Sequence, residues 1–261
     1  MASDIVLDLR ADKVIEAIKL GKRLDNRKFD EYRKLKITKN ISENANGSAR
    51  VLLGETDVIA GIKMVPGDPF PDTPKEGSIS VGVEFLPLAS PLFEPGPPRE
   101  NETELARVVD RGIRESKCLD FEKLCIKEGE KVWVVFIDMY TMNDDGNLFD
   151  ACSIAALSAL LETKIPKLGD EYKIVKGEYS GKLHLARKPL LCTTTKIAGH
   201  LVNDACFAEE KAMEARFSVA TTEDGYMAAY QKGGSGSFSP KEIDECIDLS
   251  FAKAKEIRKQ L

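Results

Sequence analysis

Four stretches of the chain have the hydrophobic pattern of helices. Residues 10–20, 102–117 and 240–261 repeat apolar side chains at intervals of three and four, which predicts helices with one buried face. Residues 148–161 (LFDACSIAALSALL) are apolar almost throughout, so this helix is expected to be buried on several sides. The sequence Ser-Pro-Lys-Glu at 239–242 supplies an N-cap, a proline in the first turn and a capping-box glutamate for the last helix.

Segments rich in β-branched and aromatic residues lie between these helices and predict two groups of strands. Strands are expected at 34–41, 48–54, 57–65, 78–86 and 131–142 in the first half, and at 190–198, 214–222 and 226–232 in the second. Turn residues at 54–56 and 223–225 predict that the strands on either side of each turn form hairpins. Strands followed by a long helix, in two successive halves, indicate a mixed α/β or α+β fold.

Proline-rich and polar stretches separate these elements. Residues 66–75 (PGDPFPDTPK) hold four prolines and are expected to form a surface loop without regular structure. The predicted domains are an N-terminal helix with its basic connection at 1–28, a first unit at 29–165, a bridge at 166–188 and a C-terminal unit at 189–261.

The composition is that of an ordinary globular protein without a membrane span. Hydrophobic residues make up 43% and charged residues 31% of the 261 positions. No apolar run approaches the roughly 20 residues that a membrane-spanning helix needs, so no membrane partner is expected. The N-terminus is acidic and lacks the apolar core of a signal peptide, which favours a cytoplasmic protein.

Residues that usually hold metals or perform nucleophilic chemistry are sparse. The six cysteines are scattered without a Cys-x-x-Cys pair, and we expect them to be reduced core residues. His184 and His200 are the only histidines, and neither has a neighbour at metal-ligand spacing, so no zinc site is predicted. The sequence contains neither a Gly-x-Ser-x-Gly nucleophile motif nor a P-loop for nucleoside triphosphates.

Three local patterns could carry chemistry but also have simpler explanations. The glycine-rich turn at 233–237 (GGSGS) precedes a capped helix and resembles a weak anion cradle. The carboxylates of 208–214 (AEEKAME) could form a metal-assisted acid patch, although Lys211 and the nearby Arg216 intrude. Asp150 lies near the start of the apolar helix, where we interpret it as complementing the helix N-terminus rather than as a catalytic group.

The net charge of −5 means that any site for a polyanion must come from local clustering of positive charge. One basic cluster lies between residues 19 and 39, where lysines and arginines outnumber acids. Runs of this kind usually form solvated surface, and we favour that interpretation here.

The helix predicted at 102–117 offers a second cluster of positive charge. Arg107, Arg111 and Arg114 occupy positions i, i+4 and i+7, which places three guanidinium groups opposite the apolar stripe. They could form an ordinary solvated face with neighbouring acids as partners. They could also bind a polyanion backbone, because guanidinium groups keep their charge and match phosphate oxygens. Spacing alone leaves both interpretations open.

Four segments together resemble one protein family. They are GSARVLLGETDVIAGIK (47–63), ELARVVDRGIRESKCLD (104–120), VWVVFIDMYTMNDDGNLFDACSIAALSALL (132–161) and LVNDACFAEE (201–210). With the GGSGSFS turn and the last helix, they resemble the RNase PH family over nearly the whole chain, and most of all the non-catalytic RNase PH-like subunit of the archaeal exosome ring. The resemblance implies an RNase PH fold of two βαβα-type units, with sheets packed against helices. It also implies a heterohexameric ring that degrades RNA from its 3′ end with inorganic phosphate.

The resemblance further implies roles for residues of this chain. Active relatives carry two aspartates six residues apart, and the matching positions here are Glu210 and Arg216, so the acid pair is degenerate and no metal site of the chain's own is expected. Inorganic phosphate and a divalent metal would belong to the active site of a catalytic RNase PH-like partner. Arg107 and Arg111 are expected to hold RNA backbone phosphates at that site, across the subunit interface, and Arg114 is a weaker candidate for the same role.

Three hypotheses follow from the sequence. The first is a non-catalytic exosome subunit that structures its partner's active site and contacts single-stranded RNA, with the RNA-binding cap proteins of the exosome as further partners. The second is a phosphate-dependent 3′-to-5′ exoribonuclease complete in one chain. The third is a purely architectural protein whose arginines only pair with their neighbours.

Overall fold

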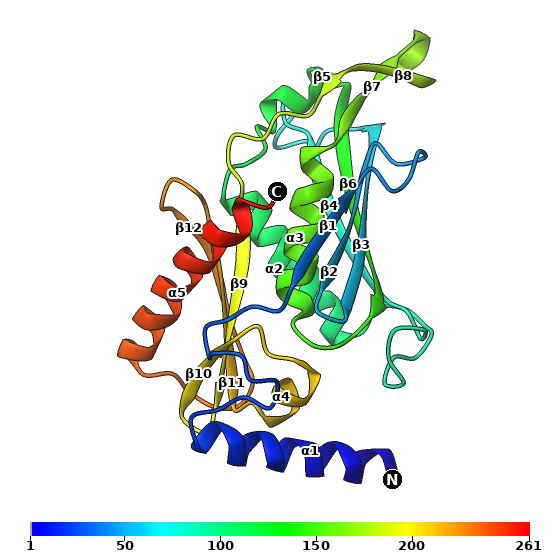
Figure 1. Cartoon of the computed structure of the whole chain (residues 1–261). Helices are drawn as coiled ribbons and strands as arrows, with labels where there is room; N and C mark the ends of the chain where they lie inside the picture. The colour runs from blue at the N-terminus through cyan, green and yellow to red at the C-terminus, as the bar shows by residue number, and fades with distance from the viewer. Residues whose placement is uncertain (1) are drawn as a thin grey trace.

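The computed structural model describes residues 2–261, with side chains from Leu9 onward, and its first half forms a six-stranded sheet (Figure 1). The strands are β1 (Leu35–Lys39), β2 (Gly47–Leu53), β3 (Thr56–Gly67), β4 (Ser78–Phe85), β5 (Cys125–Lys127) and β6 (Lys131–Asn143). Their order across the sheet is β1-β2-β3-β6-β4, with β5 beside the start of β6. β4 runs parallel to β6 and the other pairs are antiparallel, so the sheet is mixed.

The second half contributes a four-stranded antiparallel sheet and a projecting hairpin. The sheet has the order β10-β9-β11-β12 and contains β9 (Leu190–Ile197), β10 (His200–Asn203), β11 (Ala215–Thr221) and β12 (Met227–Gly233). The hairpin of β7 (Lys164–Leu168) and β8 (Ile174–Lys182) extends from the top of the molecule in Figure 1. The predicted turns at 54–56 and 223–225 do connect antiparallel neighbours, β2 with β3 and β11 with β12.

Two helices lie between the sheets, and one covers the outside of the second sheet (Figure 1). The helices are α1 (Ala2–Lys19), α2 (Glu100–Glu115), α3 (Leu148–Leu161), α4 (Phe207–Ala212) and α5 (Pro240–Arg258), with short 3-10 turns at Glu122–Leu124 and Asp170–Tyr172. α3 contacts β2 and β3 on one side and β9 on the other, whereas α5 packs on β9 and β11. None of the helices in the described part of the chain combines the length and apolar character needed to cross a membrane.

The main hydrophobic core runs through both halves because α3 has no polar face. Every residue of α3 is buried except Phe149 and Leu161, which remain partly exposed, as its apolar sequence predicts. Core residues from the first sheet and from α3 pack in one cluster with Leu190 and Cys192 of β9 and Ile257 of α5. The two halves are therefore not independently packed bodies.

One predicted loop begins later than expected. The stretch predicted as loop at 66–75 contributes Pro66 and Gly67 to β3, where Pro66 lies opposite Trp133. Proline is tolerated at this position because it lies beyond Ile62, the last residue of β3 that pairs with β2. The side of β3 that would need the missing N–H therefore has no neighbouring strand here.

Several short or polar elements differ from the predictions. The predicted bridge at 166–188 contains most of the β7–β8 hairpin, whose exposed side chains give no hydrophobic alternation. The helix predicted at 10–20 begins at Ala2, and Met1 of the predicted 1–28 segment lies outside the described residues. β10 and α4 are too short to have produced a periodic signal.

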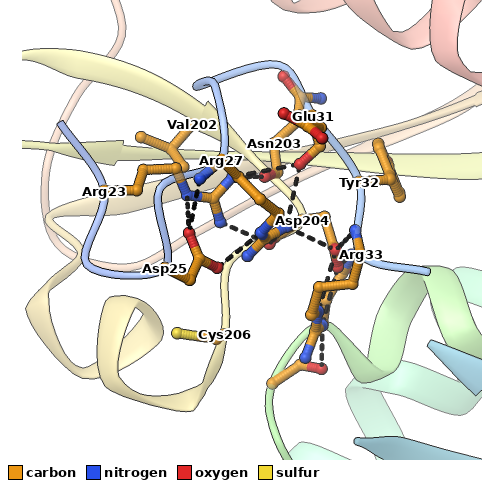
Figure 2. A network of polar contacts seen from close by, with 12 residues as sticks. Arg23, Asp25, Arg27, Glu31, Tyr32, Arg33, Val202, Asn203, Asp204 and Cys206 are labelled. Atoms are coloured by element: carbon orange, nitrogen blue, oxygen red, sulfur yellow. Dashed lines mark hydrogen bonds and ion pairs between the residues drawn. The ribbon is translucent and has the colours of Figure 1, made fainter. Parts of the chain in front are cut away.

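The arginines of the N-terminal basic cluster are buried or partly buried and ion-paired, which corrects the interpretation as solvated surface; Figure 2 shows their polar contacts. Arg23 is only 2% exposed, and its guanidinium group donates to both carboxylate oxygens of Glu209 at 2.8 and 2.6 Å. Arg27 and Arg33 both donate to the fully buried Asp204, at 2.9 and 2.8 Å. Most lysines of the cluster are exposed, so the basic run contains both a solvated set and a buried set of charges.

Arg33 also connects the two halves of the molecule. Its guanidinium group donates to Asp204 in the second half and to the backbone oxygens of Asp145 and Gly146 in the first, at 2.6 and 3.1 Å. Asp204 accepts a further hydrogen bond from the side-chain amide of Asn147 at 2.8 Å. One buried carboxylate therefore links the N-terminal connection, the turn before α3 and the loop after β10.

We expect Asp204→Asn to lower the free energy of unfolding by about 3 kcal/mol, because it leaves two largely buried arginines without their shared counter-charge. Burial opposes ionisation of Asp204, but hydrogen bonds and positive charge from Arg33 outweigh it and lower the pKa of the carboxyl group. This stabilisation is present above the unfolded pKa of about 4 and is lost as the pH falls through the lower native pKa. Urea unfolding at pH 7 and pH 3 measures it, with the exposed Asp248→Asn as control.

An equal, small effect of both substitutions at pH 7 would contradict a stabilising role for the Asp204 network. So would a difference between wild type and Asp204→Asn that grows on acidification.

Candidate nucleic-acid interface and the adjoining acid cleft

α2 presents one buried face and one charged face, as its sequence predicts. Leu105, Val109 and Ile113 belong to the main core, and Val108 packs against the second sheet. Gly112 allows this approach, because a Cβ at that position would lie 3.3 Å from the Cβ of a sheet alanine. The helix is thus fixed between β4 and β12, and its remaining face carries the arginines.

Arg107 and Arg111 are exposed and line the same groove. The groove has a volume of about 560 Å³ and lies between the start of α2 and β12. Arg111 donates through Nη2 to the side-chain oxygen of Gln231 on β12 at 2.6 Å. Arg107 makes no hydrogen bond or ion pair with any residue that the structure describes. Both guanidinium groups therefore keep an uncompensated positive charge at the surface.

Arg114 has a different environment from the other two arginines. Its Nη2 lies 2.9 Å from the Oδ1 of Asp110, one turn earlier on α2. The guanidinium group also lies over the ring of Phe121, 5.8 Å from its centroid, and donates to the backbone oxygen of Ile79 on β4 at 3.5 Å. The side chain is half-exposed but neutralised, and it does not line the groove.

A cleft of about 350 Å³ lies next to this groove, between the start of α2, the turn before α3 and α4. Its walls are partly apolar, and its charged lining residues come from both halves of the chain. These charged residues are Glu94, Arg99, Glu102, Glu104, Asp144, Glu210, Lys211 and Arg216. The structure therefore brings Glu210 and Arg216 together in one cleft, as expected for two positions that the sequence resemblance pairs.

Glu210 is a carboxyl group with weakened acidity. It accepts a hydrogen bond from the backbone N–H of Asn147 at 2.8 Å. Burial raises the pKa of Glu210 to about 7, and the nearby charge of Asp144 acts in the same direction, whereas Arg216 opposes it. Burial also raises the pKa of Asp144 itself. At neutral pH Glu210 is thus distributed between its protonated and ionised forms.

Arg216 is already ion-paired within the chain. Its Nη2 lies 2.6 Å from the Oε2 of Glu104 on α2, and its guanidinium group lies over the ring of Phe149, 4.4 Å from the centroid. The side chain passes so close to Gly233 on β12 that a Cβ there would lie 2.5 Å from the guanidinium carbon. A positive charge therefore occupies this part of the cleft, and a carboxylate balances it.

The carboxylates of the AEEKAME stretch do not converge on one point. Glu209 points to Arg23, Glu210 accepts from the turn before α3, and Glu214 is exposed beside the glycine-rich turn. Among the side chains that the structure describes, no group of three or more from His, Cys, Asp and Glu has the arrangement of a metal site.

The other two local patterns have structural explanations. In the GGSGS turn, the N–H of Gly236 donates to the backbone oxygen of Glu214 at 2.8 Å, and the carboxylate of Glu242 accepts from the N–H of Ser239 at the start of α5. Asp150 does more than complement the start of α3. It is fully buried and accepts hydrogen bonds from the hydroxyl group of Tyr32, the side chain of Asn147 and the N–H of Thr193.

Sequence reasoning missed two residues of the site and the main contact of a third. Asp144 is only part of a turn in the sequence, and Gln231 lies on an unremarkable strand. Glu104 could be recognised as a partner of Arg107 at i+3, but its contact with Arg216 depends on how α2 packs on the second sheet. Nothing local to any of these positions indicates the contact that it makes.

Comparisons with known proteins give matches over the whole chain. The model of the 3′ exoribonuclease family, domain 1, matches residues 31–166, and that of domain 2 matches residues 189–253. The exosome complex component Rrp42 of Pyrococcus horikoshii is 47% identical and covers 98% of this chain and 95% of its own length. The protein of the same name from Methanopyrus kandleri is 43% identical, and the match covers 99% of this chain and 98% of that protein.

Solved structures agree with these relatives. A chain of the Archaeoglobus fulgidus exosome with RNA bound to the active site superposes with a TM-score of 0.92 and 43% identity, covering 98% of this chain and 99% of its own. A chain of an archaeal exosome core gives a TM-score of 0.89 with 39% identity, and the match covers 100% of this chain and 99% of that chain.

We expect the stability of the isolated chain to fall as the pH rises from about 4.5 to about 7, because native Glu210 binds a proton more tightly than the unfolded chain does. Glu210→Gln cannot ionise and keeps a side-chain oxygen for the N–H of Asn147. Its free energy of unfolding relative to wild type should therefore increase by roughly 2 kcal/mol across this interval. Urea unfolding at pH 4.5, 6 and 8 measures the difference. Glu214→Gln, on a nearby exposed side chain, is the control, and parallel profiles of Glu210→Gln and wild type would contradict the assignment.

Proposed function

The chain belongs to the 3′ exoribonuclease family and has its RNase PH fold, and on this basis we propose that it is a non-catalytic subunit of an exosome ring. In this role it alternates with a catalytic RNase PH-like partner in a heterohexamer of three heterodimers. It structures the active site of that partner and binds the backbone of single-stranded RNA during 3′-to-5′ phosphorolysis. RNA-binding cap proteins of the exosome are its further partners.

The observation that carries this proposal is the pair of uncompensated arginines on α2. Arg107 and Arg111 share one open groove and have no carboxylate partner among the described residues. Contacts to phosphates fix the position of a strand without reading its sequence, which suits a nuclease that removes one nucleotide after another. Arg114 contributes less to RNA binding in this proposal, because Asp110 partly neutralises its charge.

The chemistry of the acid cleft supports the non-catalytic part of the proposal. The family's reaction calls for an acid pair, and here the second position is Arg216. A cation at this point opposes the binding of a divalent metal by electrostatic repulsion, and its partner Glu104 is already committed to the ion pair. Inorganic phosphate and any divalent metal are therefore assigned to the active site of the partner subunit.

One observation favours an alternative function, a phosphate-dependent 3′-to-5′ exoribonuclease complete in this chain. Glu210 lies in a cleft of about 350 Å³ and has a pKa of about 7, which suits a general acid near neutral pH. Phosphorolysis by the chain in the absence of a partner would support this alternative.

We expect the double substitution Arg107→Glu and Arg111→Glu to weaken RNA binding by the assembled ring at least tenfold, because two phosphate contacts are replaced by repulsion. The slope of log affinity against log salt should decrease by roughly 0.7 for each lost contact to single-stranded RNA. Fluorescence anisotropy with labelled single-stranded RNA at several salt concentrations measures both quantities. Ring assembly, followed by size-exclusion chromatography, should be unchanged.

The matched control is Lys241→Glu with Lys255→Glu, which makes the same change of charge at two exposed positions of α5. Equal RNA affinity of the two double variants would contradict RNA binding at the groove. Failure of only the arginine variant to assemble would assign Arg107 and Arg111 to the subunit interface instead.

A further inference from the structure

Two carboxylates line the groove, those of Glu100 and Glu104, and Glu104 is placed to neutralise an arginine. Glu104 lines the groove and lies three residues before Arg107 on α2, a spacing at which a glutamate and an arginine normally pair on a helix surface. The i, i+4 pair of Asp110 and Arg114 on the same helix shows the result of such pairing, because there the two charges meet at 2.9 Å. A similar pair of Glu104 with Arg107 would neutralise Arg107 and compete with a phosphate for it.

Arg216 prevents this pairing by occupying Glu104 from the other side. Its Nη2 binds the Oε2 of Glu104 at 2.6 Å, and its side chain is only 14% exposed. The ring of Phe149 and the missing side chain of Gly233 fix the path of the guanidinium group, so the ion pair is built into the packing of α2 on the second sheet.

Gln231 completes the arrangement with a neutral side chain. Its amide group donates to the Oε1 of Glu104 at 3.4 Å, and its oxygen accepts from Arg111 at 2.6 Å. Both carboxylate oxygens of Glu104 therefore face β11 and β12. Gln231 orients Arg111 without neutralising it, because the amide side chain is uncharged.

We propose that Arg216 is a positioning residue for RNA: by holding Glu104 against the second sheet, it keeps Arg107 and Arg111 free of a carboxylate partner and available for phosphate binding. The residue that replaces an acid of the catalytic relatives thus has a positive role in this chain. This inference rests on the proposed RNA-binding function of the groove and adds the ion pair that keeps Glu104 away from its arginines.

The test compares five forms of the chain in the assembled ring: wild type, Arg216→Gln, Arg216→Lys, Glu104→Gln and the double variant of Arg216→Gln with Glu104→Gln. In Arg216→Gln, Glu104 is released to pair with Arg107, and affinity for single-stranded RNA at low salt should fall severalfold, because one electrostatic contact to a phosphate is weakened. Adding Glu104→Gln removes the competing carboxylate and should restore wild-type affinity and salt slope. Arg216→Lys, which retains the positive charge beside Glu104, should bind nearly as wild type does.

The rescue separates positioning from a general structural role. The loss of a direct contact between Arg216 and RNA would leave the salt slope reduced in the double variant, and a structural defect from the unpaired Glu104 would lower the thermal stability of Arg216→Gln. Unchanged affinity of Arg216→Gln, or failure of Glu104→Gln to restore it, would overturn the inference. Thermal unfolding and ring assembly are measured on every variant, so that loss of folding is recognised.

Arg107→Ala distinguishes failure of this inference from failure of the proposed function. If Arg107→Ala weakens RNA binding while Arg216→Gln does not, only the role of Arg216 is wrong. If Arg107→Ala also binds RNA as wild type does, the groove is not an RNA site and both proposals fall.

Discussion

The buried carboxylate of Asp204 is the point on which the arrangement of the two halves depends. Arg27 and Arg33 reach it from the N-terminal connection, and Asn147 reaches it from the turn before α3. A buried carboxylate is stable only when hydrogen bonds and opposite charges compensate its lost hydration. The N-terminal connection and the turn before α3 must therefore adopt their native positions together. α4 begins shortly after Asp204 and is held by the contact of Glu209 with Arg23, and this contact in turn directs Glu210 into the acid cleft. The position of α4, which carries Glu210, therefore depends on this network of buried charges, part of which Figure 2 shows.

The packing of α2 determines which of its charges are available. Its apolar stripe is fixed between two sheets, so its outer face cannot rotate to exchange partners. Asp110 pairs with Arg114, and Arg216 pairs with Glu104, which leaves Arg107 and Arg111 without an ion-pair partner among the described residues of the groove. A chain with an overall charge of −5 can thus present a local surface suited to a polyanion.

Much of the fold could be predicted from the sequence because its long elements have strong patterns. The limits of α3 were predicted at Leu148 and Leu161, since uninterrupted apolar residues between a turn and a polar segment leave little choice. The resemblance to the RNase PH family agrees with the family matches over residues 31–166 and 189–253. The buried state of Arg23 could not be predicted, because its partner Glu209 is far along the chain and both residues look like surface charges locally. The contact of Gln231 with Arg111 could not be predicted for the same reason, because only the packing of α2 on β12 brings the two side chains together.

The most direct test of this account is phosphorolysis of single-stranded RNA with inorganic phosphate and Mg²⁺, by the purified chain alone and mixed with a catalytic RNase PH-like partner. Release of nucleoside diphosphates is measured at equal RNA concentration in the two reactions. The account predicts no activity for the chain alone and activity in the mixture above that of the partner alone. Activity of the chain alone would mean that Glu210 suffices without a second acid, and it would contradict the assignment of this protein as a supporting subunit.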